Sequence, residues 1–173
     1  MAPYLSGMCG TAGRTVRRFL PLLLLLALCL PCWVVEIAAD TSLPAQRMRL
    51  RNHASVVVGY VHSVEQTWVE ETYVVDSGGV RLVRMRWQSS GAGLPNEYDC
   101  YTDGFYVREL DIDIGRVLDY WFLPLNRVEI SVDGAVVFRG PDRPTRVVVR
   151  VRRVPVAVSI LDSVRARFAS RGN

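Results

Sequence analysis

The sequence contains no lysine, and all 21 of its basic residues are arginines. A bias that covers the whole chain is typical of codon usage in a GC-rich genome and does not single out a binding site. Selection for guanidinium groups that grip phosphate or carboxylate is the alternative reading. Histidine is also scarce, with only His53 and His62, which leaves few residues for histidine-based catalysis.

Cysteine is equally limiting. Of the four cysteines, Cys9 precedes an apolar N-terminal stretch, Cys29 and Cys32 lie within it, and only Cys100 belongs to the rest of the chain. A single cysteine cannot form a disulfide inside the domain, and two cysteines within an apolar stretch do not match a structural zinc site. The fold must therefore rely on an apolar core.

Charged residues are absent from residues 19–35, which follow Arg14, Arg17 and Arg18 and contain five consecutive leucines. A basic flank before such a run is typical of an export signal. We therefore assign residues 1–40 to a signal peptide or a single-pass membrane anchor.

Both outcomes for this segment remain open. A stretch of about 17 residues is at the lower limit for crossing a bilayer, and Ala39 before Asp40 offers a cleavage point. The basic flank should stay cytoplasmic. We therefore expect the body to lie outside, on the inner membrane facing the periplasm or free in the periplasm.

The body, residues 41–154, is rich in valine and aromatic residues, which favour strands. Many short strands at close spacing predict an all-β fold, a small antiparallel β-sandwich or barrel. Gly59 lies inside one strand, where glycine marks a bulge or a close approach. The turns at 77–79 and 133–134 predict hairpins. Strands are expected at 48–50, 56–61, 67–76, 80–88, 104–110, 117–122, 127–132, 135–138 and 146–151.

Alternation within 80–88 predicts that Val83, Met85 and Trp87 face the core. After Pro155 the period becomes helical, so residues 155–173 are expected to contain a short, arginine-rich helix. This helix either closes the end of a barrel or binds a membrane surface or partner. Its apolar stripe consists of Val156, Ile160, Leu161, Val164 and Phe168.

His62, Ser63 and Glu65 provide a base, a hydroxyl and a carboxylate in one short segment. On a strand, neighbouring side chains point to opposite faces, so His62 and Ser63 cannot form the bond that nucleophilic catalysis needs. No metal-binding loop matches the spacing of these residues with Glu70 and Glu71, or that of Asp111 with Asp113. We therefore predict no enzyme, no cofactor and no metal.

The loop Gly91–Pro95 is the most unusual local feature, because Gly91 and Gly93 permit positive φ and the close approach of a ligand. A rigid turn across the end of the sheet is the alternative. Arg84 and Arg86 precede the loop, which makes a small acidic ligand conceivable there.

Three segments in this order, Gly59–Glu65, Val69–Glu71 with Thr67, and Arg84–Ser89 running into Gly91–Pro95, resemble an uncharacterised family of small exported proteins. This is domain-of-unknown-function family 1850, whose genes lie beside TAXI-type TRAP transporters. The chain departs from it at Trp68, where the family usually has proline.

The resemblance implies a non-enzymatic, extracytoplasmic accessory protein whose partner is a TAXI-type TRAP permease or solute-binding protein. A binding module for a small acidic ligand is the alternative, and no nucleic-acid partner is expected. The residues expected to bind a ligand or partner are His62, Ser63, Glu65, Glu71, Gly91, Gly93 and Pro95.

Overall fold

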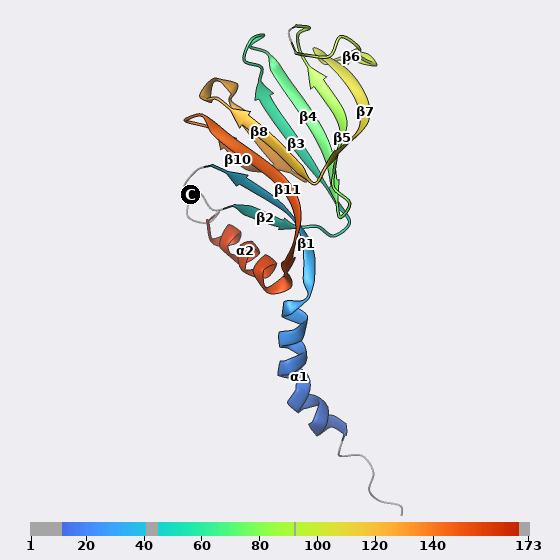
Figure 1. The fold of residues 1–173 in the computed structure, drawn as a ribbon, viewed down its shortest axis with the longest axis vertical. Helices are drawn as coiled ribbons and strands as arrows, with labels where there is room; N and C mark the ends of the chain where they lie inside the picture. Colours follow the sequence, from blue (N-terminus) through green and yellow to red (C-terminus); the bar gives the residue numbers. More distant parts are fainter. Residues whose placement is uncertain (1–11, 41–44, 92, 170–173) are drawn as a thin grey trace, which may run out of the picture.

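The structure is a computed structural model that describes residues 12–40, 45–91 and 93–169. Strands make up most of it, in two antiparallel sheets, with a helix near each end of the chain (Figure 1). The elements are α1 (Ala12–Cys29), β1 (Pro31–Ala39), β2 (Gln46–Arg49), β3 (His53–Val61), β4 (Trp68–Asp76), β5 (Val80–Trp87), β6 (Cys100–Thr102), β7 (Phe105–Gly115), β8 (Val117–Phe122), η1 (Pro124–Asn126), β9 (Val128–Val132), β10 (Ala135–Gly140), β11 (Thr145–Pro155) and α2 (Val156–Ala169).

The two sheets form a sandwich, which confirms the predicted all-β class. Of the two predicted architectures, sandwich and barrel, the sandwich is present, since neither sheet closes into a barrel. A four-stranded sheet has the order β2-β1-β11-β8, and a seven-stranded sheet has the order β10-β9-β3-β4-β5-β7-β6. Alternate residues of both inner faces fill the core, as in other sandwiches. The core draws, for example, on Val35 and Val149 from the first sheet and on Val56 and Ile130 from the second.

The predicted start of the β domain at residue 41 is wrong, because residues 31–39 form β1, an inner strand of the four-stranded sheet. This strand pairs with β11 on one side and β2 on the other. Val35 faces the main core, and Val34 packs with Cys32 and Val154 on the opposite face. A strand buried on both faces reads as a continuous apolar run. That pattern made β1 look like the end of a membrane segment.

Helix α1 contains the leucine-rich part of the apolar stretch, and the side chains of residues 22–26 are exposed. In the part of the chain that the structure describes, no helix combines the length and the apolarity needed to cross a membrane.

Strand β5 turns its side chains differently from the prediction. Met85 and Trp87 do pack inward, but Val83 does not, whereas Val80 and Leu82 are buried. The register with β4 and β7 shifts around Val83. A β-bulge adds one residue to one strand and so reverses the facing of every later residue. Local alternation could not reveal it, because the shift exists only relative to the neighbouring strands.

Helix α2 exists as predicted, although Pro155 ends β11 and the helix begins at Val156. The helix packs against β2, β1 and β11, where Val156 and Val158 contact the outer apolar cluster of the four-stranded sheet. It therefore does not close a barrel end. The predicted stripe faces solvent at Ile160, Leu161 and Val164. The side chain of Phe168 lies outside the described residues.

Both predicted hairpin turns are confirmed. The turn between β9 and β10 has positive φ at Asp133 (48°) and Gly134 (80°), as a two-residue turn of the favoured twist requires. Between β4 and β5, the Asp76 carboxylate accepts hydrogen bonds from the backbone of Gly78 and Gly79. These turns fix the register of the seven-stranded sheet.

Candidate functional site

The segment that begins at His62 is a turn and not a strand, because β3 ends at Val61 and β4 begins at Trp68. His62 N–H donates to the carbonyl of Thr67 at 2.8 Å, and the backbone N–H of Glu65 donates to His62 Nδ1 at 3.2 Å. The expectation that strand alternation directs the side chains of His62 and Ser63 is therefore wrong. Side chains in a turn do not alternate between two faces as they do in a strand.

The glycine loop packs directly on this turn. Ser89 Oγ donates to Glu65 Oε2 at 3.4 Å, and a Cβ on Gly91 would lie 1.9 Å from Glu65 Oε1. Gly93 has φ of 82°, and a Cβ there would lie 3.9 Å from His62 Nε2. The predicted positive φ is present at Gly93, and the group that closely approaches Gly91 is the Glu65 side chain of the same chain.

The structure thus brings together four of the seven predicted site residues, His62, Glu65, Gly91 and Gly93, at one end of the sandwich (Figure 1). Ser63 is exposed in the same turn, and Pro95 follows the buried Leu94. Leu94 packs with Val69 and Trp87, so this residue of the loop covers the end of the sheet. We call this end the distal end.

The distal end combines an imidazole with several aromatic rings. His62 Nδ1 already accepts a backbone hydrogen bond, and among the described residues the Ser63 hydroxyl makes no bond to the imidazole. Aromatic rings extend the surface: Tyr106 stands 6.0 Å from Trp87 between ring centroids, and Tyr98 and Tyr101 lie 4.8 and 4.9 Å from Tyr106.

The arginines expected to hold an acidic ligand are already engaged with carboxylates. Arg84 Nε donates to Glu109 Oε1 at 2.7 Å, and this bond raises the pKa of Arg84. Arg86 pairs with Glu70 at 3.4 Å and lies over the Phe105 ring. An acidic ligand would have to displace these partners.

Glu71 lies away from the other predicted residues, on the inner face of β4. Glu71 lies two residues from each of the buried residues Val69 and Tyr73, so it shares their face of the strand and points between the sheets. Its carboxylate accepts a hydrogen bond from Tyr60 at 3.1 Å, one from Tyr73 at 2.7 Å and a very short one from Tyr120. Tyr120 belongs to β8, so the carboxylate links the two sheets.

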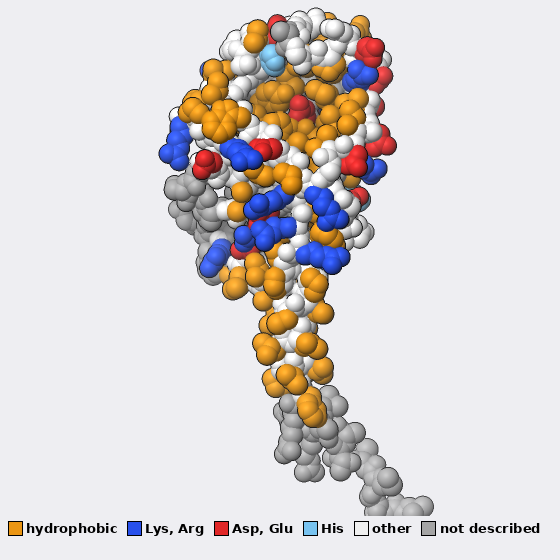
Figure 2. Space-filling view, in the orientation of Figure 1, with side chains coloured by type: hydrophobic (Ala, Val, Ile, Leu, Met, Phe, Trp, Pro, Cys, Tyr) orange, Lys and Arg blue, Asp and Glu red, His pale blue; other side chains and the backbone are white. Residues whose placement is uncertain are grey.

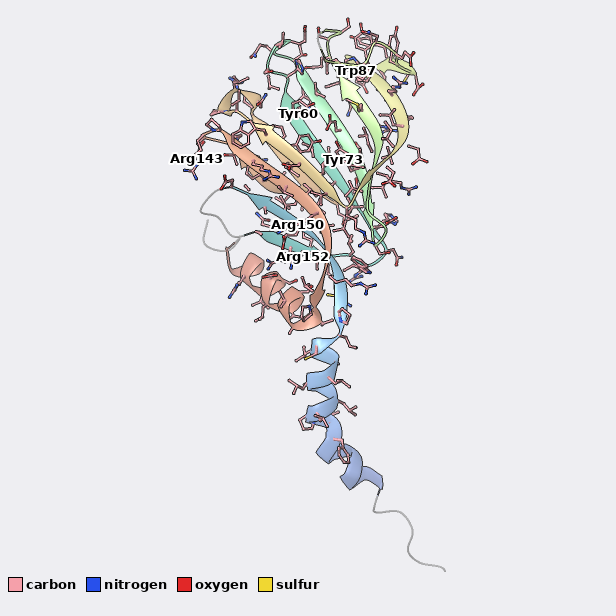
Figure 3. All side chains as sticks on the ribbon, viewed as in Figure 1. Tyr60, Tyr73, Trp87, Arg143, Arg150 and Arg152 are labelled. Atoms are coloured by element: carbon pink, nitrogen blue, oxygen red, sulfur yellow. The ribbon has the colours of Figure 1, made fainter. Side chains whose placement is uncertain are left out.

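The three tyrosines were not predicted as site residues, although the alternation of residues 69–75 could have placed Glu71 beside Tyr73. Burial raises the pKa of Tyr60, Tyr73 and Tyr120 well above the ordinary value of 10, and the neighbouring Glu71 carboxylate adds to the rise. The phenols therefore stay protonated at physiological pH. Figure 3 shows Tyr60 and Tyr73 on neighbouring strands.

A second carboxylate, Glu36, is fully buried on the outer face of the four-stranded sheet. Arg47 and Arg150 each donate from Nε at 2.5 Å, and Arg152 lies 3.3 Å away. Burial opposes ionisation, but the hydrogen bonds from Arg47 and Arg150 outweigh it and lower the pKa of Glu36. Arg47 also reaches Asp162 of α2 at 3.2 Å, which fastens the helix to the sheet.

Arginines also gather at the end from which α1 leaves, which we call the base. The guanidinium carbons of Arg116 and Arg153 lie 5.1 and 4.6 Å from the ring centroid of Trp33, near the start of β1. Figure 2 shows basic side chains concentrated between the body of the domain and the apolar stalk of α1. Arg150 and Arg152 belong to the same region (Figure 3).

These features define an antiparallel β-sandwich with a leucine-rich helix at its base and a pair of packed turns at its distal end. Residues 56–138 match the family model described as domain of unknown function (DUF1850). The match extends from β3 to β10 and so covers almost all of the seven-stranded sheet. No curated protein and no solved structure matches the chain.

Proposed function

We propose that this chain is a non-enzymatic accessory domain, held at the outer side of the cytoplasmic membrane, that binds a component of a TAXI-type TRAP transporter. The proposal rests on one structural relationship: α1 and the base arginines lie at one end of the sandwich, and the turns that carry the family motifs lie at the other (Figure 1). A domain built in this way can be held at a membrane while its distal end remains free for a partner.

The base has the composition of a surface that meets anionic lipid headgroups. Arg116 and Arg153 flank Trp33, and tryptophan with arginine is typical of membrane interfaces. Exposed apolar residues of α2, Ile160, Leu161 and Val164, add to the exposed leucines of α1, and the two helices touch each other. This supports the membrane-surface alternative for α2.

The distal end has the composition of a partner-binding surface. Val64 is 66% exposed at the tip of the turn, and Tyr98 and Tyr101 are 52% and 60% exposed. Aromatic side chains that remain exposed on a rigid support are enriched in protein interfaces. His62 and Glu65 hold the turn against the glycine loop, so they keep the shape of this surface.

Co-purification of the full chain with the TAXI-type permease and the solute-binding protein of the same genome tests the proposal. We expect one of them to be retained, and we expect Val64→Glu combined with Tyr101→Glu to reduce retention at least tenfold. Glu109→Gln, in an exposed ion pair on β7, serves as the matched control. Retention of neither protein by the wild type, or equal retention by the distal variant, would contradict the proposal.

Membrane apposition has its own test. Vesicles that contain phosphatidylglycerol should bind the full chain more strongly than vesicles of phosphatidylcholine alone, and added salt should reduce the difference. Arg116→Glu combined with Arg153→Glu should remove the preference, whereas Arg84→Glu should keep it. An equal preference in all three proteins would show that the base does not contact anionic lipid.

A further inference from the structure

The inner faces of the sandwich carry one carboxylate whose surroundings differ sharply from those of Glu36. Glu36 is buried beneath three arginines. Glu71 accepts only phenol hydrogen bonds, and among the described residues no basic side chain lies within ion-pair distance of it. A carboxylate that is partly removed from water is stabilised by a neighbouring cation. The described part of the chain does not supply that cation at Glu71.

The surroundings of Glu71 are partly exposed, since Tyr60 and Tyr120 are, like Glu71, only half-buried. Figure 2 shows a hollow lined by hydrophobic side chains over β3 and β4, with an acidic side chain inside it. The seven-stranded sheet is wider than the four-stranded sheet that faces it, so part of its inner face remains uncovered. Glu71 is half-buried, and the partly buried residues Met85 and Leu110 pack against the core on the same inner face.

Aromatic rings surround the carboxylate. Tyr60 stands 5.8 Å from Phe122 between ring centroids, and Tyr120 stacks on Phe122 at 4.9 Å. Ring faces attract organic cations, and the attraction strengthens when water is excluded. Glu71 Oε1 accepts one hydrogen bond in the structure, that of Tyr60, and therefore retains a lone pair for a second donor.

We propose that this hollow, which we call the Glu71 site, binds a small organic cation: a protonated amine or quaternary ammonium with an apolar body. The ammonium group pairs with Glu71 and lies against the rings of Tyr60 and Tyr120. The apolar body contacts Met85 and Leu110. The ligand is thus opposite in charge to the acidic ligand considered for Arg84 and Arg86, and it occupies a different face of the sheet.

The rings and the carboxylate have separate roles in this proposal. The phenols orient the carboxylate, because each of Tyr60, Tyr73 and Tyr120 donates to one of its oxygens. The raised phenol pKa values keep those donors in place across physiological pH. The negative charge of Glu71 favours a cationic ligand, and the apolar side chains of Met85 and Leu110 favour one with a hydrocarbon part.

Calorimetric titration of the full chain with three matched probes tests the inference. Cyclohexylmethylammonium, cyclohexylmethanol and cyclohexanecarboxylate share one ring and differ in charge, and benzyltrimethylammonium with benzyl alcohol extends the panel. We expect each cation to bind at least tenfold more tightly than its neutral counterpart, and the carboxylate not to bind. The inference is overturned if no cation binds better than its counterpart.

Two variants assign the binding to Glu71. Glu71→Gln should weaken cation binding at least tenfold. Glu70→Gln should leave it unchanged, because Glu70 is adjacent in sequence but lies on the opposite face of β4. Unchanged binding in Glu71→Gln overturns the site. If that variant does not fold, methyl resonances of the wild type decide: cations should shift the signal of Met85 and spare that of Met48 on the edge strand β2, and the reverse pattern overturns the site.

Discussion

The indole of Trp68 on β4 lies over Gly59 of β3 so closely that a Cβ on residue 59 would lie 2.3 Å from Cζ2 of Trp68. The indole covers the strand at the one position without a side chain.

Gly59→Ala should therefore destabilise the domain by about 1–3 kcal/mol, because the added methyl group must displace the indole. Combined with Trp68→Ala, the same change should cost less than the sum of the two single changes. Denaturant unfolding of the three variants measures the coupling. Strict additivity would show that the indole moves aside at no cost.

Glu36→Ala should be strongly destabilising, because it leaves Arg47, Arg150 and Arg152 without their shared partner. Removing one member of a buried ion pair costs about 3–5 kcal/mol, and we expect the lower end because the arginines reach solvent. Urea unfolding at neutral pH gives the value. A loss no larger than that of Glu129→Ala, in an exposed pair with Arg139, would contradict this expectation.

Glu36 should also make the stability of the folded domain depend on pH in the acidic range. Its pKa in the folded state lies below the ordinary value of 4.5, so its contribution is complete above that pH and disappears as the pH falls through the folded-state pKa. The melting temperature of Glu36→Gln should therefore fall less between pH 5 and pH 2 than that of the wild type. Parallel profiles for the two proteins would contradict the assignment.

His62→Ala should lower the melting temperature, because the backbone N–H of Glu65 loses its acceptor at a cost of about 1–2 kcal/mol. His62→Asn, which keeps an acceptor near the same place, should recover part of the loss. Glu65→Ala should leave the fold intact and weaken partner binding. A stable His62→Ala that loses its partner would instead make His62 a contact residue.

The chain that reaches its final location should retain β1. Cleavage after Ala39 would remove a strand that pairs on both edges, together with the buried side chains of Val34, Val35 and Glu36. Peptide mapping of the protein from membrane and periplasmic fractions should recover residues 31–39. A folded, soluble chain that begins at Asp40 would contradict this prediction.

Local patterns were sufficient wherever neighbours in sequence decide the structure. Alternation and turn residues located β2, β3, β4, β5, β7, β8, β9, β10 and β11 within a few residues, and Asp133-Gly134 fixed the β9–β10 hairpin. The short strand β6 was missed, because three exposed residues give no alternation to detect. The glycines of the 91–95 loop predicted the close approach of a ligand, whereas the structure places the Glu65 side chain against Gly91, where only a residue without Cβ fits.

The sequence by itself determined the all-β class, the hairpins and the motif segments, because backbone sterics and hydrophobic alternation act over a few residues. The tertiary structure alone decided three further features. It showed that residues 31–39 are a core strand, since burial on both faces requires a partner sheet and a covering helix. It reversed the facing of β5 through a bulge that exists only relative to β4 and β7. It also brought Tyr120 of one sheet to Glu71 of the other, a contact across 49 residues that no local period encodes.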